Sequence, residues 1–432
     1  LSVNLLILLS IYYFSRVDFI KIITIFLITL FIFNLFISSN NFIIIFSSLV
    51  LIVLGIFELT TVINSEDVRL TSSEYVLKNY ILRFFLIAAF SLILMLLGFS
   101  LIFGATDLKT FIQILESEKL NISILKTGLL MIFAGVFVFL FLFPFQSAYI
   151  RLLKRSTFLT NIIIWFFYLP AGIFLFLKLK NIFFYFSLNN YFYISIALNI
   201  LAALSIIGGN LDAIKTKSTR RITSFLYMAN IGFVILILAL YSTGIIESFR
   251  VTYLIISSIF VAAFSYLPIS LILSKIEKES GSDSIENIYG IGRQNKFIGV
   301  IFIITLLSFA GFIGTVGYIN RFLTLQPLFI FFKNGSFLSQ DLNPSATSPL
   351  LKYIAGGLTL AGWVFIAVNI LRILIIVFKK PVAKKNIEIP KFYYLYLSFY
   401  ALLILWLGVS GLLEFFNANI YLTGYSILNV SF

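Results

Sequence analysis

Long uninterrupted apolar runs constrain this chain more than any other feature of its sequence. Residues 19–38, 42–63 and 80–104 carry a single charged residue each. A helix of about 20 apolar residues crosses the hydrocarbon core of a bilayer. The runs are continuous rather than alternating, which argues against a membrane β-barrel. Because backbone polar groups in lipid must be satisfied internally, the sequence predicts an all-α polytopic membrane protein.

Composition agrees with this class, since 61% of the 432 residues are hydrophobic and 11% are charged. A soluble domain carries about 25% charged residues. We predict about twelve transmembrane helices and no soluble domain. The predicted spans are residues 1–14, 19–38, 42–63, 80–104, 124–147, 158–178, 191–213, 222–245, 251–275, 297–332, 350–378 and 392–416.

The net charge of +14 lies mostly in short loops on one predicted side of the membrane. Cytoplasmic loops of membrane proteins carry an excess of Lys and Arg. The charge therefore predicts orientation, with both termini outside, rather than nucleic-acid binding. Lipids are the expected surroundings of the spans.

The chain contains no Cys and no His. This excludes disulfides, thiolate metal sites, iron–sulfur clusters and imidazole acid–base chemistry. We expect no metal and no cofactor in this chain. Any proton chemistry has to use Lys, Arg, Asp, Glu, Tyr or water.

The predicted span 297–332 is long for one straight helix and contains Gly311, Gly314 and Gly317. A broken helix accommodates both the length and the glycines. Irregular backbone at membrane depth is tolerated where it lies against protein or a wet cavity, and in transporters it marks ion paths. Arg321 follows this segment within apolar sequence, so it is either buried on a hydrated path or snorkels to the lipid head groups.

Glu58 lies late in the apolar run 42–63. A carboxylate within a span costs about 2.5–3.5 kcal/mol on insertion scales and is usually functional. The alternative places Glu58 near the inner interface, because Asn64, Glu66 and Asp67 follow soon after.

Pro144, inside the run 124–147, removes a backbone hydrogen bond and predicts a kink.

Several ordered motifs resemble the antiporter-like membrane subunits of respiratory complex I, specifically the subunit N (subunit 2) family. The first group is Gly209-Asn210-Leu211-Asp212-Ala213-Ile214 with Arg220-Arg221-Ile222. The second is Ile285-Glu286-Asn287-Ile288-Tyr289-Gly290-Ile291-Gly292-Arg293. The third is Leu307-Ser308-Phe309-Ala310-Gly311 with Gly317-Tyr318-Ile319-Asn320-Arg321-Phe322. With residues 74–78 and 103–106, the resemblance covers most of residues 58–378.

The resemblance implies one transmembrane domain over residues 1–432, with N-terminal spans at 1–57, an antiporter-like core at 58–378, and a basic loop and last span at 379–432. It also implies two discontinuous helices. In such subunits protons are thought to pass along buried lysines and a glutamate, while NADH oxidation, flavin, clusters and quinone reduction belong to other chains. The expected partners are the other membrane-arm subunits, in a hetero-oligomer.

The resemblance assigns the glutamate role to Glu58 and places Arg321 where the family has a lysine in its second broken helix. Pro144 marks the first break. The chain departs from the pattern because Phe139 and Leu169 stand at the family's other lysine positions and Asn230 stands at its histidine. We therefore expect a proton path that has lost part of its central row, or one completed by water and tyrosine.

Three other functions remain open on the sequence alone. A subunit of a related cation/proton antiporter or membrane-bound hydrogenase shares these motifs, a lipid-linked glycan flippase shares the basic apolar composition, and a structural membrane spacer fits the missing lysines.

The 51 Phe and 22 Tyr, with abundant Ile, Lys and Asn, are residues of AT-rich codons. This bias predicts an organellar gene and the mitochondrial inner membrane, with a bacterial plasma membrane as the alternative.

Overall fold

The computed structural model describes residues 19–67, 74–106, 122–156, 158–187, 192–242, 248–334, 349–379 and 394–410. Within these ranges the chain is mainly helical, and an isolated bridge pairs Ser218 with Ser284. This confirms the predicted all-α class. Each predicted span except 1–14, which lies outside the described residues, contains a helix.

Eight helices in the described part of the chain are long and apolar enough to cross a membrane, or nine if one bent pair is counted as a single span. Residues 127–139 and 394–410 form shorter apolar helices. The multi-pass architecture is therefore observed, while the predicted number of spans stays a prediction.

The described residues divide into two compact units, one made mainly of residues 1–208 and the other mainly of residues 209–432. One transmembrane domain over 1–432 stays a prediction, and the boundary between the two compact units falls within a single helix. Each unit contains one interrupted helix, and these interruptions are the two discontinuous helices that the resemblance implies.

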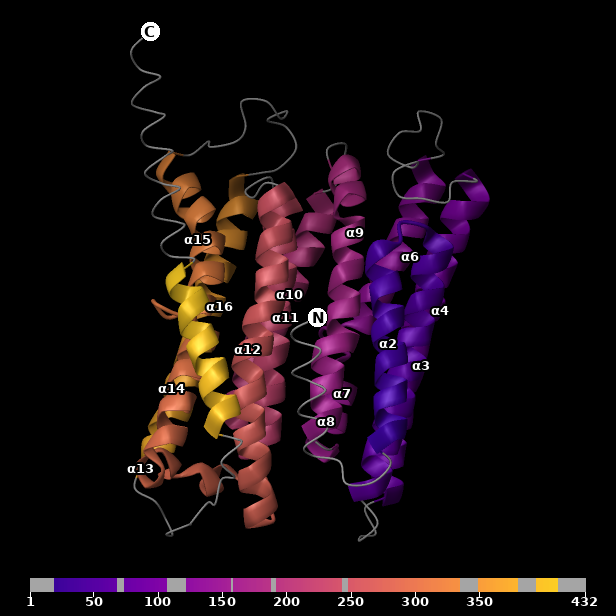
Figure 1. Cartoon of the computed structure of the whole chain (residues 1–432). Helices are drawn as coiled ribbons and strands as arrows, with labels where there is room; N and C mark the ends of the chain where they lie inside the picture. Colours follow the sequence, from indigo (N-terminus) through magenta and orange to yellow (C-terminus); the bar gives the residue numbers. More distant parts are fainter. Residues whose placement is uncertain are drawn as a thin grey trace. The chain divides into compact units, whose positions relative to one another are not determined.

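In the described part of unit 1, seven α-helices precede the helix that continues into unit 2, and Figure 1 labels them. They are α2 (Phe19–Ser38), α3 (Phe42–Asp67), α4 (Glu74–Thr106), α6 (Ile122–Phe139), α7 (Gln146–Arg155), α8 (Phe158–Ile163) and α9 (Leu169–Ser187). A single π-helical turn, Ile164–Tyr168, joins α8 to α9. The sequence predicted one plain span at 158–178, and this turn was not foreseen.

Glycines bring α4 and α6 into close contact within unit 1. A Cβ atom on Gly98 would lie 2.4 Å from the carbonyl oxygen of Gly128. A Cβ atom on Gly135 would lie 2.8 Å from the carbonyl oxygen of Ser91. Small residues allow this approach in lipid, where helix association depends on van der Waals packing rather than on the hydrophobic effect.

Helix α10 (Phe192–Lys215) leads into unit 2, which continues with α11 (Thr219–Ser242) and α12 (Ser248–Ser280). A short 3₁₀ turn, Ile285–Ile288, and α13 (Ile291–Gln294) precede α14 (Lys296–Ala310). The chain bends by 114° between these short helices and α14. Helices α15 (Val316–Asn334), α16 (Pro349–Phe378) and the helix over residues 394–410 complete the unit.

Candidate functional site

The interruption in unit 2 lies at residues 311–315, between α14 and α15. Gly311 ends α14 with φ 79°, and Gly314 has φ 86°, a left-handed conformation that glycine adopts without steric cost. A Cβ atom on Gly317 would lie 1.6 Å from the carbonyl oxygen of Ser308. The three glycines singled out from the sequence therefore lie at the break, two for their backbone conformation and one for its close approach.

Arg321 lies one turn into α15 and its side chain is 2% exposed. It is the one charged side chain that the structure buries among the residues it describes. Gly311 leaves room for it, because a Cβ atom there would lie 2.5 Å from the Cγ of Arg321. The structure thus places Arg321 in the interior of unit 2 rather than at the head groups.

Helix α11 supplies the partners of the buried guanidinium. Arg321 Nη2 donates to Asn230 Oδ1 at 2.9 Å, and the guanidinium carbon lies 3.9 Å from the centre of the Phe233 ring. Within the described residues, no acceptor reaches Arg321 Nη1 and no carboxylate forms an ion pair with Arg321. The site therefore offers a cation with an unused donor, held by an amide and an aromatic face.

Neighbouring polar contacts fix α15 against α12. Asn320 Nδ2 donates to the carbonyl oxygen of Leu254 and to the hydroxyls of Ser257 and Ser258 at 2.8–2.9 Å. Ser265 donates to Ser308 at 3.1 Å. The Asn320 contacts thus hold α15 against α12, and the Ser265–Ser308 contact holds α14 against the same helix.

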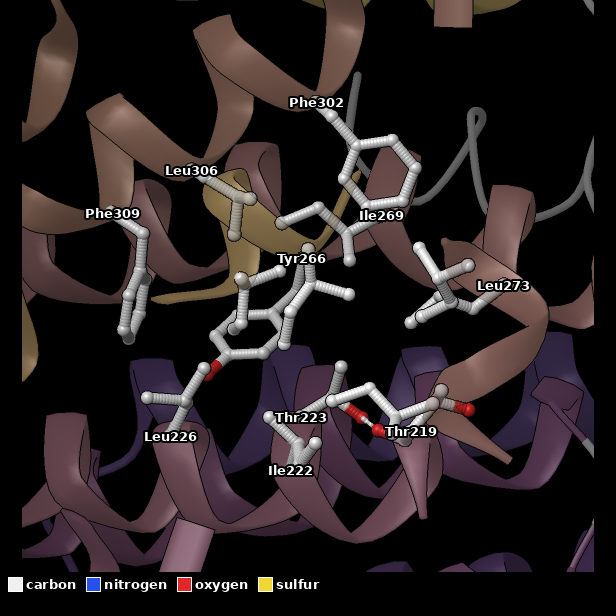
Figure 2. Close-up of a pocket in the computed structure, with 14 residues that line it drawn as sticks. Thr219, Ile222, Thr223, Leu226, Tyr266, Ile269, Leu273, Phe302, Leu306 and Phe309 are labelled. Carbon is white, nitrogen blue, oxygen red and sulfur yellow. Dashed lines mark hydrogen bonds between the residues drawn. The ribbon is translucent and has the colours of Figure 1, made fainter. Parts of the chain in front are cut away.

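A small cavity of about 30 Å³ lies among α11, α12, α14 and α16 of the same unit. In Figure 2, Phe302, Leu306 and Phe309 lie on one side and Thr219 and Thr223 on the other, with the Tyr266 ring between them. Its exposed lining is apolar. Thr219, Thr223 and Tyr266 carry the polar groups at its border, and the other lining residues are aliphatic or aromatic.

The interruption in unit 1 covers residues 140–145, between α6 and α7. The sequence predicted a kink at Pro144, and the helix in fact ends at Phe139, several residues earlier. Pro144 lies inside the interrupted segment and is exposed. A proline removes only its own N–H and clashes one turn back, which fits an interruption that precedes it.

Aromatic packing fills the positions where the resemblance would place lysines. Phe139 is fully buried and stacks on Tyr168 with ring centres 4.1 Å apart and an interplanar angle of 7°. Leu169 is also fully buried. Phe141 packs against Phe84, Tyr149 and Tyr168. Aromatic and aliphatic side chains, with Tyr149 and Tyr168 among them, therefore fill these positions of unit 1.

Glu58 lies on an exposed position of α3 in unit 1, together with Leu51 and Leu54, which are 48% and 45% exposed. Among the described residues, no Lys or Arg forms an ion pair with it. Of the three candidate proton-path residues, the structure brings Arg321 and Asn230 together and leaves Glu58 on the outer face of unit 1.

Sequence reasoning missed the aromatic stack, the π-helical turn and the Phe233 contact. The sequence held a weak indication of this stack, because Phe139 stands at one position where the family pattern is lost and Tyr168 precedes the other, Leu169. The roles of Glu58, Arg321 and Asn230 stay predictions. In the described part of the chain, no group of His, Cys, Asp and Glu that could hold a metal ion occurs.

Comparison with known proteins gives a family match over residues 39–333, to the transmembrane family described as NADH:quinone oxidoreductase/Mrp antiporter. The NADH-quinone oxidoreductase subunit N of Orientia tsutsugamushi is 26% identical over 292 residues, which are 66% of this chain and 58% of that protein. Subunit N of Geobacillus kaustophilus is 28% identical over 124 residues, covering 29% of this chain and 24% of that protein. The chain thus matches well under two thirds of the length of these relatives.

Solved structures share the fold. The chain is similar to one in respiratory complex I from Thermus thermophilus, with a TM-score of 0.67, 18% identity, and 94% and 82% of the two chains covered. It is also similar to one in an archaeal membrane-bound sulfane sulfur reductase, with a TM-score of 0.76, 17% identity and coverage of 96% and 79%. A chain of the Mrp complex from Dietzia gives a TM-score of 0.72, 13% identity and coverage of 95% and 80%.

Proposed function

Since this chain belongs to the NADH:quinone oxidoreductase/Mrp antiporter transmembrane family, we propose that it is the subunit N of a complex I-type NADH:quinone oxidoreductase. The named relatives support this assignment. The chain would contribute to proton translocation, while NADH oxidation and quinone reduction, with their cofactors, would take place on other subunits. Its partners would be the other membrane-arm subunits and lipid.

The observation that carries the mechanistic part of this proposal is the buried guanidinium of Arg321, bound to Asn230 at 2.9 Å. A guanidinium does not release its proton readily, whereas a buried lysine can be shifted toward neutrality. Arg321 would therefore act as a fixed positive charge. At about 10 Å and an effective dielectric of about 20, such a charge changes the energy of another buried ion by about 1–2 kcal/mol.

The packing of unit 1 also supports a subunit that does not conduct protons along its whole length. Phe139 and Tyr168 stack where the family pattern would place a lysine, and an apolar cluster of this kind cannot solvate a moving proton. We infer that unit 1 has lost its share of the proton path. The subunit would then transmit an electrostatic change to its neighbours through Arg321 rather than conduct protons along its own length.

The assembly is tested by gentle detergent extraction of native membranes, native-gel separation and mass spectrometry of the band that contains this chain. We expect a very large band that oxidises NADH and contains other membrane-arm subunits. A band without NADH-oxidising activity, made of cation-exchange subunits, would contradict the proposal.

The fixed-charge mechanism needs a second measurement on the intact assembly. Arg321→Met is expected to lower the number of protons moved per NADH oxidised, while Arg321→Lys preserves the charge and most of that ratio. An unchanged ratio in Arg321→Met would show that the charge has no role in coupling.

A subunit of a cation/proton antiporter complex is the second candidate. The likeness to the Mrp complex, with a TM-score of 0.72, is of the same order as the likeness to complex I, so the fold does not separate the two functions. The relatives named subunit N favour complex I. The same native-gel experiment distinguishes the two candidates by the partner subunits in the band.

For the membrane in which this chain lies, the relatives and the codon bias point to different compartments, and our proposal uses the relatives. The subunit N relatives named above are bacterial proteins, which supports a bacterial plasma membrane over the mitochondrial inner membrane expected from composition. Fractionation of the source cells, with immunodetection of this chain, would test the assignment.

A further inference from the structure

A short segment between α12 and α13 closes one end of the small cavity in unit 2. Ile285 and Ile288 line the cavity together with the helices, and they are 6% and 4% exposed. They stand three residues apart in the 3₁₀ turn, and side chains at this spacing lie on the same side of such a turn. Glu286, between them, is exposed. The turn therefore directs an apolar face into the cavity and a charged residue toward the outside.

The closed end of the cavity belongs to the polar end of unit 2. Figure 2 shows Thr219 at one end of the cavity and Phe309 at the other. Thr219 is the first residue of α11, and the next residue, Arg220, pairs with Glu277 at 2.6 Å. Charged side chains are costly in hydrocarbon. The end that the two isoleucines close therefore faces the aqueous phase or the lipid head groups.

The opposite end of the cavity approaches the buried charge of Arg321. Tyr266 and Phe309 line this end, with their ring centres 4.9 Å apart. Leu226 also lines the cavity, and Asn230, the hydrogen-bond partner of Arg321, follows it one turn later on α11. Four residues of helix span about 6 Å. Water at this end of the cavity would therefore lie about one helical turn from the partner of the guanidinium.

Water has no stable site in the closed cavity. The volume of about 30 Å³ has room for about two water molecules, but a buried water needs two to four polar partners. The Thr223 hydroxyl already donates to the carbonyl oxygens of Thr219 and Arg220 at 3.2 and 3.0 Å. A dry void also gives Ile285 and Ile288 no atoms to contact on that side, which weakens the packing that holds them in place.

Glycines in the left-handed conformation stand at both ends of this segment. Gly281 and Gly290 have φ values of 70° and 75°, which glycine adopts without steric cost. The space around Gly281 is open, since an added Cβ atom would meet nothing within 4 Å. Between the glycines, Asn287 Nδ2 donates to the carbonyl oxygen of Ser282 at 2.9 Å. The segment is therefore held together internally and has a conformationally permissive residue at each end.

Asp283 ties the segment to the start of α11. Its carbonyl oxygen accepts from the backbone N–H of Thr219 at 2.8 Å, and its carboxylate accepts from the hydroxyl of Ser218. The backbone N–H of Ile285 donates to the carbonyl oxygen of Lys217 at 2.8 Å. These contacts place the turn over the end of the cavity, and one of them depends on a single carboxylate.

We propose that residues 281–290 form a hinged plug, which keeps the cavity dry while Asp283 is bound to α11 and admits water as far as Tyr266 when it is released. The plug turns about its two glycines and withdraws its two isoleucines together. Water in the cavity raises the local dielectric and weakens the field of the buried guanidinium. The plug thereby sets how strongly Arg321 acts on other charges, and this last step rests on the proposed function.

The absence of cysteine from the sequence allows a site-specific test on the intact assembly in native membranes. Thr223→Cys places the only thiol of the chain at the cavity, at a position that is 7% exposed. Thr305→Cys is the matched control, because Thr305 is fully buried in α14 and does not line the cavity. Each thiol is combined with native Asp283, Asp283→Ala or Asp283→Asn. The rate of modification by N-ethylmaleimide is measured by mass spectrometry.

We expect Asp283→Ala to raise the labelling rate of Thr223→Cys about tenfold or more, since loss of a hydrogen bond to a charged group shifts a local opening equilibrium by such a factor. Thr305→Cys should keep its slow rate. Asp283→Asn preserves the size of the side chain and should give a smaller rise, so it replaces Asp283→Ala if that variant does not assemble. An unchanged rate at Thr223→Cys, or an equal rise at both thiols, would overturn the plug.

The number of protons moved per NADH oxidised separates the plug from the proposed function. Asp283→Ala is expected to lower this number, and to lower it no further when Arg321→Met is already present. Faster labelling with an unchanged number would refute the link to Arg321. Unchanged labelling in an assembly that oxidises NADH would refute the plug alone, whereas faster labelling in an assembly without NADH oxidation would refute the proposed function and leave the plug.

Discussion

Arg321 combines a buried charge with a neutral partner, and this sets how the site responds to substitution. Its guanidinium is 2% exposed and bonded to Asn230, with no carboxylate among the described residues to neutralise it. Removing a buried ion in favour of an apolar side chain is often neutral or stabilising, whereas removing the partner of a buried ion is costly. Replacing Asn230 is therefore expected to cost more stability than replacing Arg321 by an apolar residue.

Asn230→Ala is expected to destabilise the protein by about 2–3 kcal/mol, because it leaves a buried charged donor without its acceptor. Arg321→Met is expected to change stability by less than about 1 kcal/mol, since it removes the charge together with its demand for a partner. Thermal unfolding of the purified assembly checks both variants. In the double variant Asn230→Ala/Arg321→Met, the loss of stability caused by Asn230→Ala should largely disappear. If Asn230→Ala lowers stability equally with and without Arg321, this account is contradicted.

The aromatic cluster of unit 1 makes a second residue-scale prediction. Phe139→Lys would bury an ammonium group among apolar side chains beside the Tyr168 ring, and we expect a loss of about 3 kcal/mol or more. Tyr168→Phe removes a hydroxyl that has no hydrogen-bond partner among the described residues, so it should be neutral or slightly stabilising. Melting temperatures of the two variants measure the contrast. A stable Phe139→Lys protein with restored proton transfer would show that unit 1 retains a polar path.

At the scale of elements, the break between α14 and α15 depends on three glycines that are close in sequence and on one tryptophan from a later helix. Gly311 and Gly314 allow the left-handed turns, Gly317 allows α15 to pass the end of α14, and Trp363 reaches across from α16. The interruption is thus held by contacts from three helices. These contacts also set where α15 begins, and Arg321 of this helix reaches Asn230.

Gly317→Ala is expected to destabilise unit 2 strongly, because the new methyl group would overlap the Ser308 carbonyl oxygen at 1.6 Å. Gly357→Ala is the control, since a Cβ atom there meets nothing within 4 Å. Alanine in place of glycine within a helix stabilises by about 0.5–1 kcal/mol. The two substitutions should therefore shift the midpoint of thermal unfolding in opposite directions, and a shift in the same direction would refute the close contact.

At the scale of the whole molecule, the sequence was most informative where a single stretch of chain determines the outcome. Apolar runs predicted the helices, and Gly311, Gly314 and Gly317 predicted the second break, because span length and left-handed turns are local properties. The pair Arg321 and Asn230 and the stack of Phe139 on Tyr168 depend on helices that meet only after folding. Glu58 shows the same limit, since the apolar run around it does not reveal which face of α3 is exposed.

The division into two units predicts that packing damage stays local. Gly98→Ala would press a methyl group against the Gly128 carbonyl oxygen at 2.4 Å and separate α4 from α6 in unit 1, while Gly317→Ala acts in unit 2. Because each unit has its own internal contacts and proteins open in cooperative local units, hydrogen–deuterium exchange should rise in α4 and α6 for Gly98→Ala and in α14 and α15 for Gly317→Ala. Mass spectrometry of peptides from both units, in the same detergent, measures the two patterns. Equal acceleration of exchange in both units by either substitution would show that the chain opens as one cooperative body, and that damage to the α4–α6 contact reaches the buried arginine.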